Sequence, residues 1–331
     1  MLNNIVSYLV APHKFNNEAC MLPDIVPSDY VRVKYEYCGI CGGDYSRFLG
    51  YRNDYPISLG HEFVAKVLDI NCNKGLSYNI GDYVVSDFNY RCGECSFCMQ
   101  NKTHLCLKND AALFTNRAFS HYADIHYSYL VKTNIPYNYL YRATVVEPLS
   151  CIIHAMNHYN LSEINFILIY GTGNIGMLCA FYLSCCLGKN VQLFDTNIVK
   201  QKYITNLFSC TPVDYKTSYD LVIEATNSSF GLSQCIEHYA SVKNICSFSH
   251  LYGQATENLY DKLVKKECSI YFPLRNGSRK NLYFATELIE QNWKNSFDKL
   301  IQIYETDDLN FPFEEKLKCN KPKQVIKLVI E

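Results

Sequence analysis

The chain has 331 residues, of which 48% are hydrophobic, 19% are charged and 17 are cysteine, and its formal net charge is −1. This length exceeds that of one ordinary hydrophobic core, so two domains are expected. The balance of acidic and basic residues argues against a general partner of nucleic acids or anionic membranes, because both kinds of binding need a basic excess.

Two features argue against export and membrane insertion. The first ten residues lack the basic start and the long apolar run of a signal peptide, and they predict a strand instead. The apolar stretches 166–170 and 175–187 are too short or too interrupted to cross a bilayer. We therefore expect a cytoplasmic protein, in which clustered cysteines bind metal rather than form disulfides.

Residues 1–148 predict a mainly β domain. Short runs of β-branched and aromatic residues alternate with polar positions and are separated by Gly, Pro, Asn and Asp. The clearest runs are 30–35, 63–68 and 82–86. Their alternation is typical of strands that bury one face.

After residue 148 the pattern changes to alternating strands and helices. A helical run at 149–159 precedes a strand at 165–170, a glycine turn and a helix that ends near 187. Further strands are predicted at 191–194, 220–224 and 244–248. This alternation predicts an α/β domain with a doubly wound parallel sheet over 149–271.

The segment 272–331 contains a predicted helix at 279–291 and a predicted strand at 324–330. These two elements are too few to form an independent domain. We expect the segment to return to the N-terminal domain and complete it.

Four cysteines in the loop 91–106 have the spacing of a metal site. They are Cys92, Cys95, Cys98 and Cys106. Four thiolates satisfy tetrahedral Zn²⁺ and leave no position for a substrate, so the loop predicts a structural zinc ion. An iron–sulfur cluster uses the same ligands, and the spacing alone leaves this alternative open. A nucleic-acid-binding zinc module is disfavoured, because only Arg91 and Lys102 add positive charge at the edges of the loop.

A second candidate metal site combines one thiolate, one imidazole and carboxylates. Its residues are Cys41, His61, Glu62 and Glu147. Three protein ligands of these types leave a coordination position open for water or an alcohol oxygen. A His-Glu pair alone is more often an ordinary surface or core feature. The combination with the cysteine loop and the glycine turn is far more specific.

The glycine turn predicts a dinucleotide site. It follows the strand 166–170, leads into a helix, and consists of Gly171, Thr172, Gly173, Asn174, Ile175 and Gly176. The glycines allow a tight turn and close approach of a pyrophosphate to the backbone. Asp195 ends the next strand, where its carboxylate can accept hydrogen bonds from the adenosine ribose and repel a 2′-phosphate. NAD is therefore preferred over NADP, with an ordinary turn aspartate as the alternative interpretation.

These motifs, in this order, resemble the medium-chain, zinc-dependent alcohol dehydrogenase family. The resemblance spans positions 38 to 195 and implies a GroES-like β-rich catalytic domain followed by a Rossmann domain. It also implies that Cys41 and His61 bind a catalytic zinc ion beside Glu62, so that each chain holds two zinc ions and binds NAD. Where ethanol-type members place a further cysteine, this chain has Glu147, which is similar to the polyol branch. Whether Glu62, Glu147 or both bind the zinc stays open.

Two positions depart from the family pattern. A hydroxyl residue and a histidine usually form a proton relay, and here the two positions are Gly43 and Ser46. We therefore expect Glu147 or Glu62, with ordered water, to act catalytically as the proton acceptor, and we keep Ser46 as a further catalytic candidate.

The resemblance implies hydride transfer between NAD(H) and the secondary alcohol of a polyol, sugar or polyol phosphate. Arg275 and Arg47 are the candidate substrate residues. An amino alcohol such as threonine is the alternative substrate. A catalytically impaired protein that still binds zinc and NAD is the alternative of another class, suggested by Gly43 and Ser46. The resemblance further implies a homodimer or homotetramer with no nucleic-acid or membrane partner.

Overall fold

The computed structural model describes residues 1–89, 91–108, 117–214, 218–238, 244–251, 259–267, 269–292, 297–316 and 318–329. Contacts within the chain divide it into two units. The β-rich unit comprises residues 1–150, 275–319 and 323–331, and the α/β unit comprises residues 151–274 and 320–322. The sequence placed the corresponding boundaries at 148 and 271.

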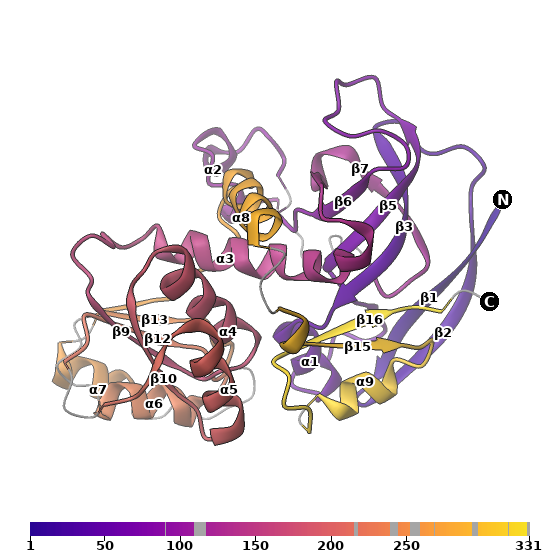
Figure 1. The fold of residues 1–331 in the computed structure, drawn as a ribbon. Coiled ribbons are helices and arrows are strands. Elements are labelled where there is room, and N and C mark those ends of the chain that lie inside the picture. Colours follow the sequence, from indigo (N-terminus) through magenta and orange to yellow (C-terminus); the bar gives the residue numbers. More distant parts are fainter. Residues whose placement is uncertain are drawn as a thin grey trace. The chain divides into compact units, whose positions relative to one another are not determined.

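The β-rich unit contains two sheets (Figure 1). The three-stranded sheet has the order β2-β1-β4, with β1 (Leu2–Ala11), β2 (Lys14–Leu22) and β4 (Ile57–Ser58). The seven-stranded sheet has the order β15-β16-β3-β5-β6-β8, and β7 pairs with β3. Its strands are β3 (Tyr30–Gly39), β5 (Glu62–Asn71), β6 (Tyr83–Ser86), β7 (Tyr122–His126), β8 (Leu130–Thr133), β15 (Ile301–Glu305) and β16 (Lys323–Lys327).

Several short helices connect these strands. The α-helices are α1 (Gly42–Phe48), α2 (Ser96–Met99), α8 (Arg279–Asn292) and α9 (Asn310–Glu315), and α3 (Val146–Met156) crosses the boundary between the units. The 3₁₀ helices are η1 (Thr103–Leu105), η3 (Tyr127–Tyr129), η4 (Tyr137–Val145) and η6 (Phe297–Lys299).

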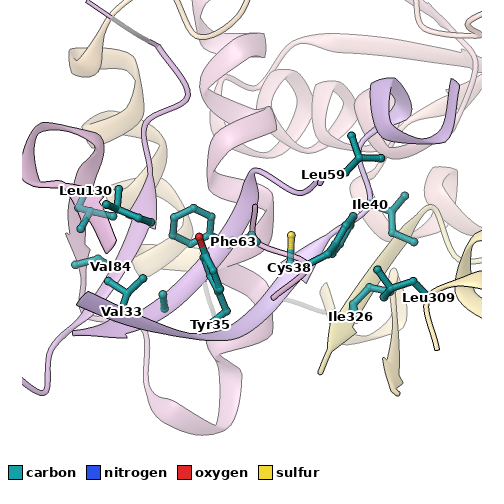
Figure 2. Packing of buried hydrophobic residues seen from close by; sticks show 14 of the residues in the cluster. Val33, Tyr35, Cys38, Ile40, Leu59, Phe63, Val84, Leu130, Leu309 and Ile326 are labelled. Atoms are coloured by element: carbon teal, nitrogen blue, oxygen red, sulfur yellow. The ribbon is translucent and has the colours of Figure 1, made fainter. Parts of the chain in front are cut away.

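The C-terminal segment contributes to the core of the β-rich unit (Figure 2). Strand β16 pairs antiparallel with β3, so that Val325 lies opposite Gly39 and Ile326 opposite Cys38. Leu309 and Ile326 are buried in the same cluster as Phe63. The last residues of the chain therefore help to bury the apolar face of β3. The predicted strand 324–330 is seen as β16, and residue 330 lies outside the described residues.

The α/β unit is built on one parallel sheet with the order β11-β10-β9-β12-β13-β14. Its strands are β9 (Phe166–Tyr170), β10 (Asn190–Phe194), β11 (Thr211–Pro212), β12 (Leu221–Glu224), β13 (Asn244–Ser247) and β14 (Ser269–Tyr271). Its helices are α4 (Asn174–Ala180), the π-helix η5 (Phe181–Cys186), α5 (Ile198–Phe208), α6 (Ser229–His238) and α7 (Leu259–Lys266).

This strand order confirms the predicted doubly wound sheet. The chain begins at the centre with β9, continues outward through β10 and β11, and then returns to the other side of β9 with β12. Ligands of such sheets bind at the carboxyl ends of the strands where the order reverses, which here is between β9 and β12.

Within the described residues, we find no helix that is both long and apolar enough to span a lipid bilayer.

Candidate metal and dinucleotide sites

The four cysteines of the loop between β6 and β7 come together in the β-rich unit. Their four sulfur atoms, which belong to Cys92, Cys95, Cys98 and Cys106, all lie within 4.8 Å of one another. The sulfurs of Cys92 and Cys98 are 3.9 Å apart. A tetrahedral zinc ion with bonds of about 2.3 Å holds its sulfurs about 3.8 Å apart, so the cluster fits zinc closely.

Backbone N–H groups of the loop point at these sulfurs. Gly93 has a φ of +77°, and this tight turn lets the N–H of Cys95 donate to Cys92 Sγ at 3.4 Å. Backbone N–H groups also lower the pKa of Cys92 and lower that of Cys95 to about 6. Burial raises the pKa of Cys98 to about 12. The exposed part of the loop is thus prepared to present thiolates to a cation.

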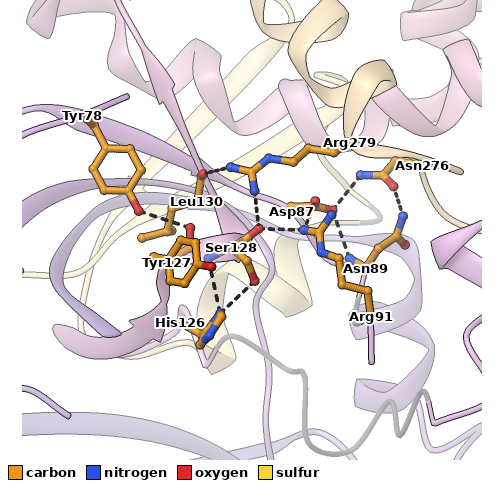
Figure 3. A network of polar contacts seen from close by, with 10 residues as sticks. All are labelled: Tyr78, Asp87, Asn89, Arg91, His126, Tyr127, Ser128, Leu130, Asn276 and Arg279. Carbon is orange, nitrogen blue, oxygen red and sulfur yellow. Dashed lines mark hydrogen bonds and ion pairs between the residues drawn. The ribbon is translucent and has the colours of Figure 1, made fainter. Parts of the chain in front are cut away.

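A polar network joins the start of this loop to β8 and to the start of α8 (Figure 3). Arg91 donates to Asp87 Oδ2 and to the carbonyl of Ser128, both at 2.6 Å. Arg279 donates to the same Ser128 carbonyl at 2.7 Å and to that of Leu130 at 2.6 Å. This network was not predicted from the sequence, because its partners lie up to 189 residues apart.

The second predicted set, Cys41, His61 and Glu62, also comes together in the β-rich unit. Their donor atoms lie within 4.8 Å of one another. Cys41 is the N-cap of α1, and Glu62 is the first residue of β5. Gly60, with a φ of +95°, turns the chain just before His61. One thiolate, one imidazole and one carboxylate at this spacing fit a zinc site with an open coordination position.

Neighbouring groups fix the orientation of His61. Its Nδ1 lies 3.8 Å from Asp44 Oδ1, and its ring stacks on Phe88 with centroids 4.4 Å apart. Its backbone carbonyl accepts a hydrogen bond from Ser86. Burial lowers the pKa of His61, but the Asp44 carboxylate and the Cys41 thiol outweigh this effect and raise it well above its ordinary value. Partners of this kind hold the imidazole of a metal site in place.

A buried lysine from the C-terminal strand holds Glu62. Lys323 Nζ donates to Glu62 Oε2, and the two side chains are 0% and 2% exposed. Gly39 on β3 leaves room for this pair, because a Cβ at that position would overlap the Lys323 ammonium and the Glu62 carboxylate. Lys323 was not predicted from the sequence, because it lies in a short strand 261 residues from its partner.

Glu147 and Ser46 are not part of the set formed by Cys41, His61 and Glu62. Glu147 is buried and its charge contributes to the raised pKa of His61, but it is not among the atoms that gather within 4.8 Å in the described part of the chain. Ser46 is also buried, and its hydroxyl donates to the carbonyl of Gly42 one turn earlier in α1. The catalytic roles of Glu147 and Ser46 stay predictions.

The two candidate substrate arginines have different surroundings. Arg47 Nε contacts both carboxylate oxygens of Asp54, at 3.1 and 3.3 Å. The guanidinium carbon of Arg275 lies 5.4 Å from the centroid of the Phe88 ring, which is the ring that stacks on His61. Only Arg275 is linked in this way to the Cys41–His61–Glu62 set.

The space around the turn of the α/β unit explains why three of its residues are glycine. Gly171 has a φ of +102°, and a Cβ there would lie 2.8 Å from the carbonyl oxygen of Ala225. A Cβ at Gly176 would collide with the carbonyl of Gly171. A Cβ at Gly173 would meet no protein atom within 4 Å, which leaves space for a phosphate beside the turn. Asn174 and Ile175 then begin α4.

Asp195 lies directly beside this turn, after the end of β10. Its Oδ2 accepts hydrogen bonds from the N–H and the hydroxyl of Thr172, both at 2.6 Å, and its Oδ1 accepts one from the N–H of Asn197 at 2.7 Å. Each carboxylate oxygen has further acceptor capacity, so Asp195 can still receive a ribose hydroxyl.

Comparison with known proteins identifies relatives of this chain. Residues 27–136 match the alcohol dehydrogenase GroES-like domain. The chain is 34% identical over 161 residues to D-arabitol-phosphate dehydrogenase from Enterococcus avium. The aligned stretch covers 45% of this chain and 43% of the relative. It is 30% identical over 169 residues to sorbitol dehydrogenase from Halalkalibacterium halodurans, and this aligned stretch covers 48% of this chain and 47% of the relative. The match therefore spans about half the length of these curated relatives.

A solved structure resembles the whole chain in fold. A zinc-binding dehydrogenase from Sinorhizobium meliloti 1021, bound to NADP, aligns with a TM-score of 0.82 at 20% identity and covers 99% of this chain and 100% of that one. At this identity the resemblance establishes the fold.

We predict that the purified protein holds two zinc ions per chain and that Cys98→Ser holds one, because three thiolates and a hydroxyl do not replace four thiolates. Metal analysis by mass spectrometry measures the stoichiometry, and a thermal scan should show a lower unfolding temperature for the variant. The exposed Cys20 lies outside both sets, so Cys20→Ser should keep both ions. Retention of two ions by Cys98→Ser would contradict the assignment.

We predict that Lys323→Met lowers the free energy of unfolding by about 3–5 kcal/mol, because it leaves the Glu62 carboxylate buried without its cation. The double variant Glu62→Gln/Lys323→Met should be more stable than the single one. Lys327 on the same strand forms an exposed pair with Glu305, so Lys327→Met should change the stability by about 1 kcal/mol or less. Denaturant unfolding of the four proteins tests this, and equal losses for Lys323→Met and Lys327→Met would refute it.

Proposed function

Because the chain belongs to the medium-chain zinc-dependent alcohol dehydrogenase family, we propose that it is an NAD-dependent oxidoreductase acting on the secondary alcohol of a polyol, sugar or polyol phosphate. The observation that carries the proposal is the gathering of Cys41, His61 and Glu62 into an open site in a chain that also has the glycine turn. The named activities of the two curated relatives support the choice of a polyol.

The proposed site assigns a role to each of its side chains. Cys41, His61 and Glu62 would hold zinc, which polarises the alcohol oxygen when bound, while the nicotinamide accepts the hydride. Asp44 keeps the His61 ring oriented, and Lys323 holds one oxygen of Glu62. The four-cysteine loop would hold the second, structural zinc ion.

Oxidation of an alcohol also releases a proton, and Glu147 and Glu62 are the candidate groups that accept it. The Glu147 carboxylate is buried and close enough to His61 to affect its pKa. Glu62 contacts Lys323, and the Ser46 hydroxyl donates within its own helix. Glu147 or Glu62, with ordered water, is therefore kept as the candidate proton acceptor, and Ser46 as a further candidate.

Asp195 supports NAD rather than NADP as the cosubstrate. Its carboxylate is fixed beside the glycine turn by Thr172 and Asn197. A fixed negative charge at this place accepts hydrogen bonds from ribose hydroxyls and repels a 2′-phosphate. Lys200, at the start of α5, is the nearest cation in sequence that could favour NADP instead.

The proposal extends to a cytoplasmic homodimer or homotetramer. Two thiolate-rich metal sites, and the absence of disulfides among the described cysteines, are compatible with a reducing compartment. Strand β14 pairs with β13 at the edge of the parallel sheet, and within the described residues its other edge is unpaired, so a second copy could extend the sheet there.

We predict that the zinc-loaded protein produces NADH from NAD when supplied with sorbitol, arabitol or their phosphates, and that His61→Ala abolishes this activity. Absorbance at about 340 nm follows the reaction, since reduced nicotinamide absorbs there. Threonine as the best substrate would favour the amino-alcohol alternative. Failure with every alcohol and matching ketone, despite two bound zinc ions and bound NAD, would favour the catalytically impaired protein and refute the enzyme.

We predict that Asp195→Ala lowers the ratio of kcat/KM for NAD to kcat/KM for NADP by about 10- to 100-fold, the effect of losing one charged hydrogen-bond acceptor. Initial rates with both cofactors and one polyol give the ratio. Asp261, an exposed residue of α7, provides a control of the same charge, and Asp261→Ala should leave the ratio unchanged. An unaltered ratio in Asp195→Ala would show that another group selects the cofactor.

A further inference from the structure

Glu224 carries a buried carboxylate at the carboxyl edge of the parallel sheet. It is the last residue of β12, and it lies in register with Tyr170 at the end of β9 and with Ser247 at the end of β13. Its side chain is 0% exposed. A carboxylate that is removed from water is stable only where hydrogen bonds replace its hydration. The segments that follow β12 and β13 provide these hydrogen bonds.

Three hydroxyl groups and one backbone N–H donate to the Glu224 carboxylate. Its Oε1 accepts from the N–H of Thr226 at 2.8 Å, from the hydroxyl of Thr226 at 2.5 Å and from the hydroxyl of Ser249 at 2.8 Å. Its Oε2 accepts from the hydroxyl of Ser247 at 2.6 Å. Both serines are buried. The carboxylate therefore ties the segment after β12 to the segment after β13.

The same two segments are joined a second time through Asn227. Its backbone N–H donates to Ser249 Oγ at 2.7 Å, and its side-chain oxygen accepts from the N–H of His250 at 2.9 Å. Asn227 has a φ of +56°, in the left-handed region, and such a backbone persists where the surrounding contacts impose it. Ser249 is thus the link between the two segments, because it accepts from Asn227 and donates to Glu224.

The segment after β12 forms one side of the glycine turn. A Cβ at Gly171 would lie 2.8 Å from the carbonyl oxygen of Ala225 and 3.1 Å from the methyl carbon of Thr226. The strand order reverses between β9 and β12, which precede these two segments. A dinucleotide with its pyrophosphate at the turn therefore meets the segment that Glu224 holds.

The direction in which the dinucleotide lies follows from Asp195. This residue comes after β10, on one side of β9, whereas β12 and β13 lie on the other side. In a doubly wound sheet each half of the sheet receives one nucleotide, and the pyrophosphate lies between the halves. Because Asp195 is placed to receive the adenosine ribose, the nicotinamide nucleotide is directed toward β12 and β13. The two tied segments are on this nicotinamide side.

We propose that Glu224 and Ser249 are positioning residues for the nicotinamide half of NAD, because they hold the segments after β12 and β13 in the conformation that receives it. The inference rests on the NAD dependence of the proposed function and adds two residues to it. Segments that are already ordered lose less conformational freedom when a ligand binds, so the network increases the affinity for the whole dinucleotide. ADP lacks the nicotinamide nucleotide and gains nothing from the network.

The test compares the binding of NADH and ADP to the zinc-loaded protein. Nicotinamide fluorescence follows the binding of NADH, and calorimetry follows the binding of ADP. Ser249→Ala should raise the Kd for NADH about 3- to 10-fold, the effect of having to order one or two residues at the moment of binding. The same variant should leave the Kd for ADP within about twofold of the wild-type value.

Two substitutions of Glu224 provide a second readout. Glu224→Leu removes every acceptor from the centre of the network, so it should raise the Kd for NADH at least as much as Ser249→Ala. Glu224→Gln keeps one acceptor oxygen for Thr226 and Ser249, and its amide can donate to the Ser247 hydroxyl. This conservative variant should therefore keep the Kd for NADH within about threefold of wild type. If Glu224→Leu does not fold, Glu224→Gln and Ser249→Ala still decide the question.

Ser184 provides a control for the loss of one serine hydrogen bond elsewhere in the α/β unit. Its hydroxyl donates to the carbonyl of Phe208, and it belongs to η5, which follows α4. Ser184→Ala should lower the unfolding temperature about as much as Ser249→Ala, because each loses a hydroxyl hydrogen bond. It should leave the Kd values for NADH and ADP unchanged.

The outcomes separate the two proposals. An equal rise in Kd for NADH and ADP in Ser249→Ala, or an unchanged Kd for NADH, would overturn the positioning role, while NADH binding by the wild-type protein would still support the proposed function. If the wild-type protein does not bind NADH, the NAD-dependent function falls and the positioning role falls with it.

Discussion

The buried ion pair between Lys323 and Glu62 is the constraint on which the candidate metal site depends. Moving two charged groups out of water costs several kcal/mol each, so such a pair is stable only where its geometry is fixed. Here β16 brings Lys323 beside β3, and Gly39 leaves the space that both side chains fill. Glu62 adjoins His61 at the start of β5, so the same pair positions the two neighbouring candidate ligands.

The side chains of the candidate sites lie at the ends of rigid elements. Cys41 caps a helix, Glu62 begins a strand, and Asp195 follows one. Each is then held by a neighbour that makes no contact with substrate in the proposal, as Asp44 holds His61 and Thr172 holds Asp195. This arrangement, in which a second side chain holds the first in place, is typical of sites that must keep donor atoms within a fraction of an ångström of their working positions.

The features that could be predicted from the sequence are those formed by residues that lie close together along the chain. The four cysteines, the glycine turn and Asp195 are close in sequence or follow directly from strand and helix patterns. The structure gathers the four cysteines in the β-rich unit and, within the α/β unit, places Asp195 beside the glycine turn. Lys323, Asn276 and the stacking of Phe88 on His61 were missed, because pairing over such distances in the chain leaves no periodic signal. Arg275 was named from its approximate position, and only the fold revealed the ring that it covers.

The return of the chain through β16 also sets an order for biosynthesis. A ribosome releases the N-terminal residues first, and local structure can form while the rest of the chain is still being made. The four cysteines lie within one loop, so that loop can capture an ion early. Glu62 is made just as early, yet its buried partner Lys323 is made 261 residues later. The buried surroundings of the candidate catalytic site are therefore completed only after residue 323 has been made, at a later stage than the four-cysteine loop.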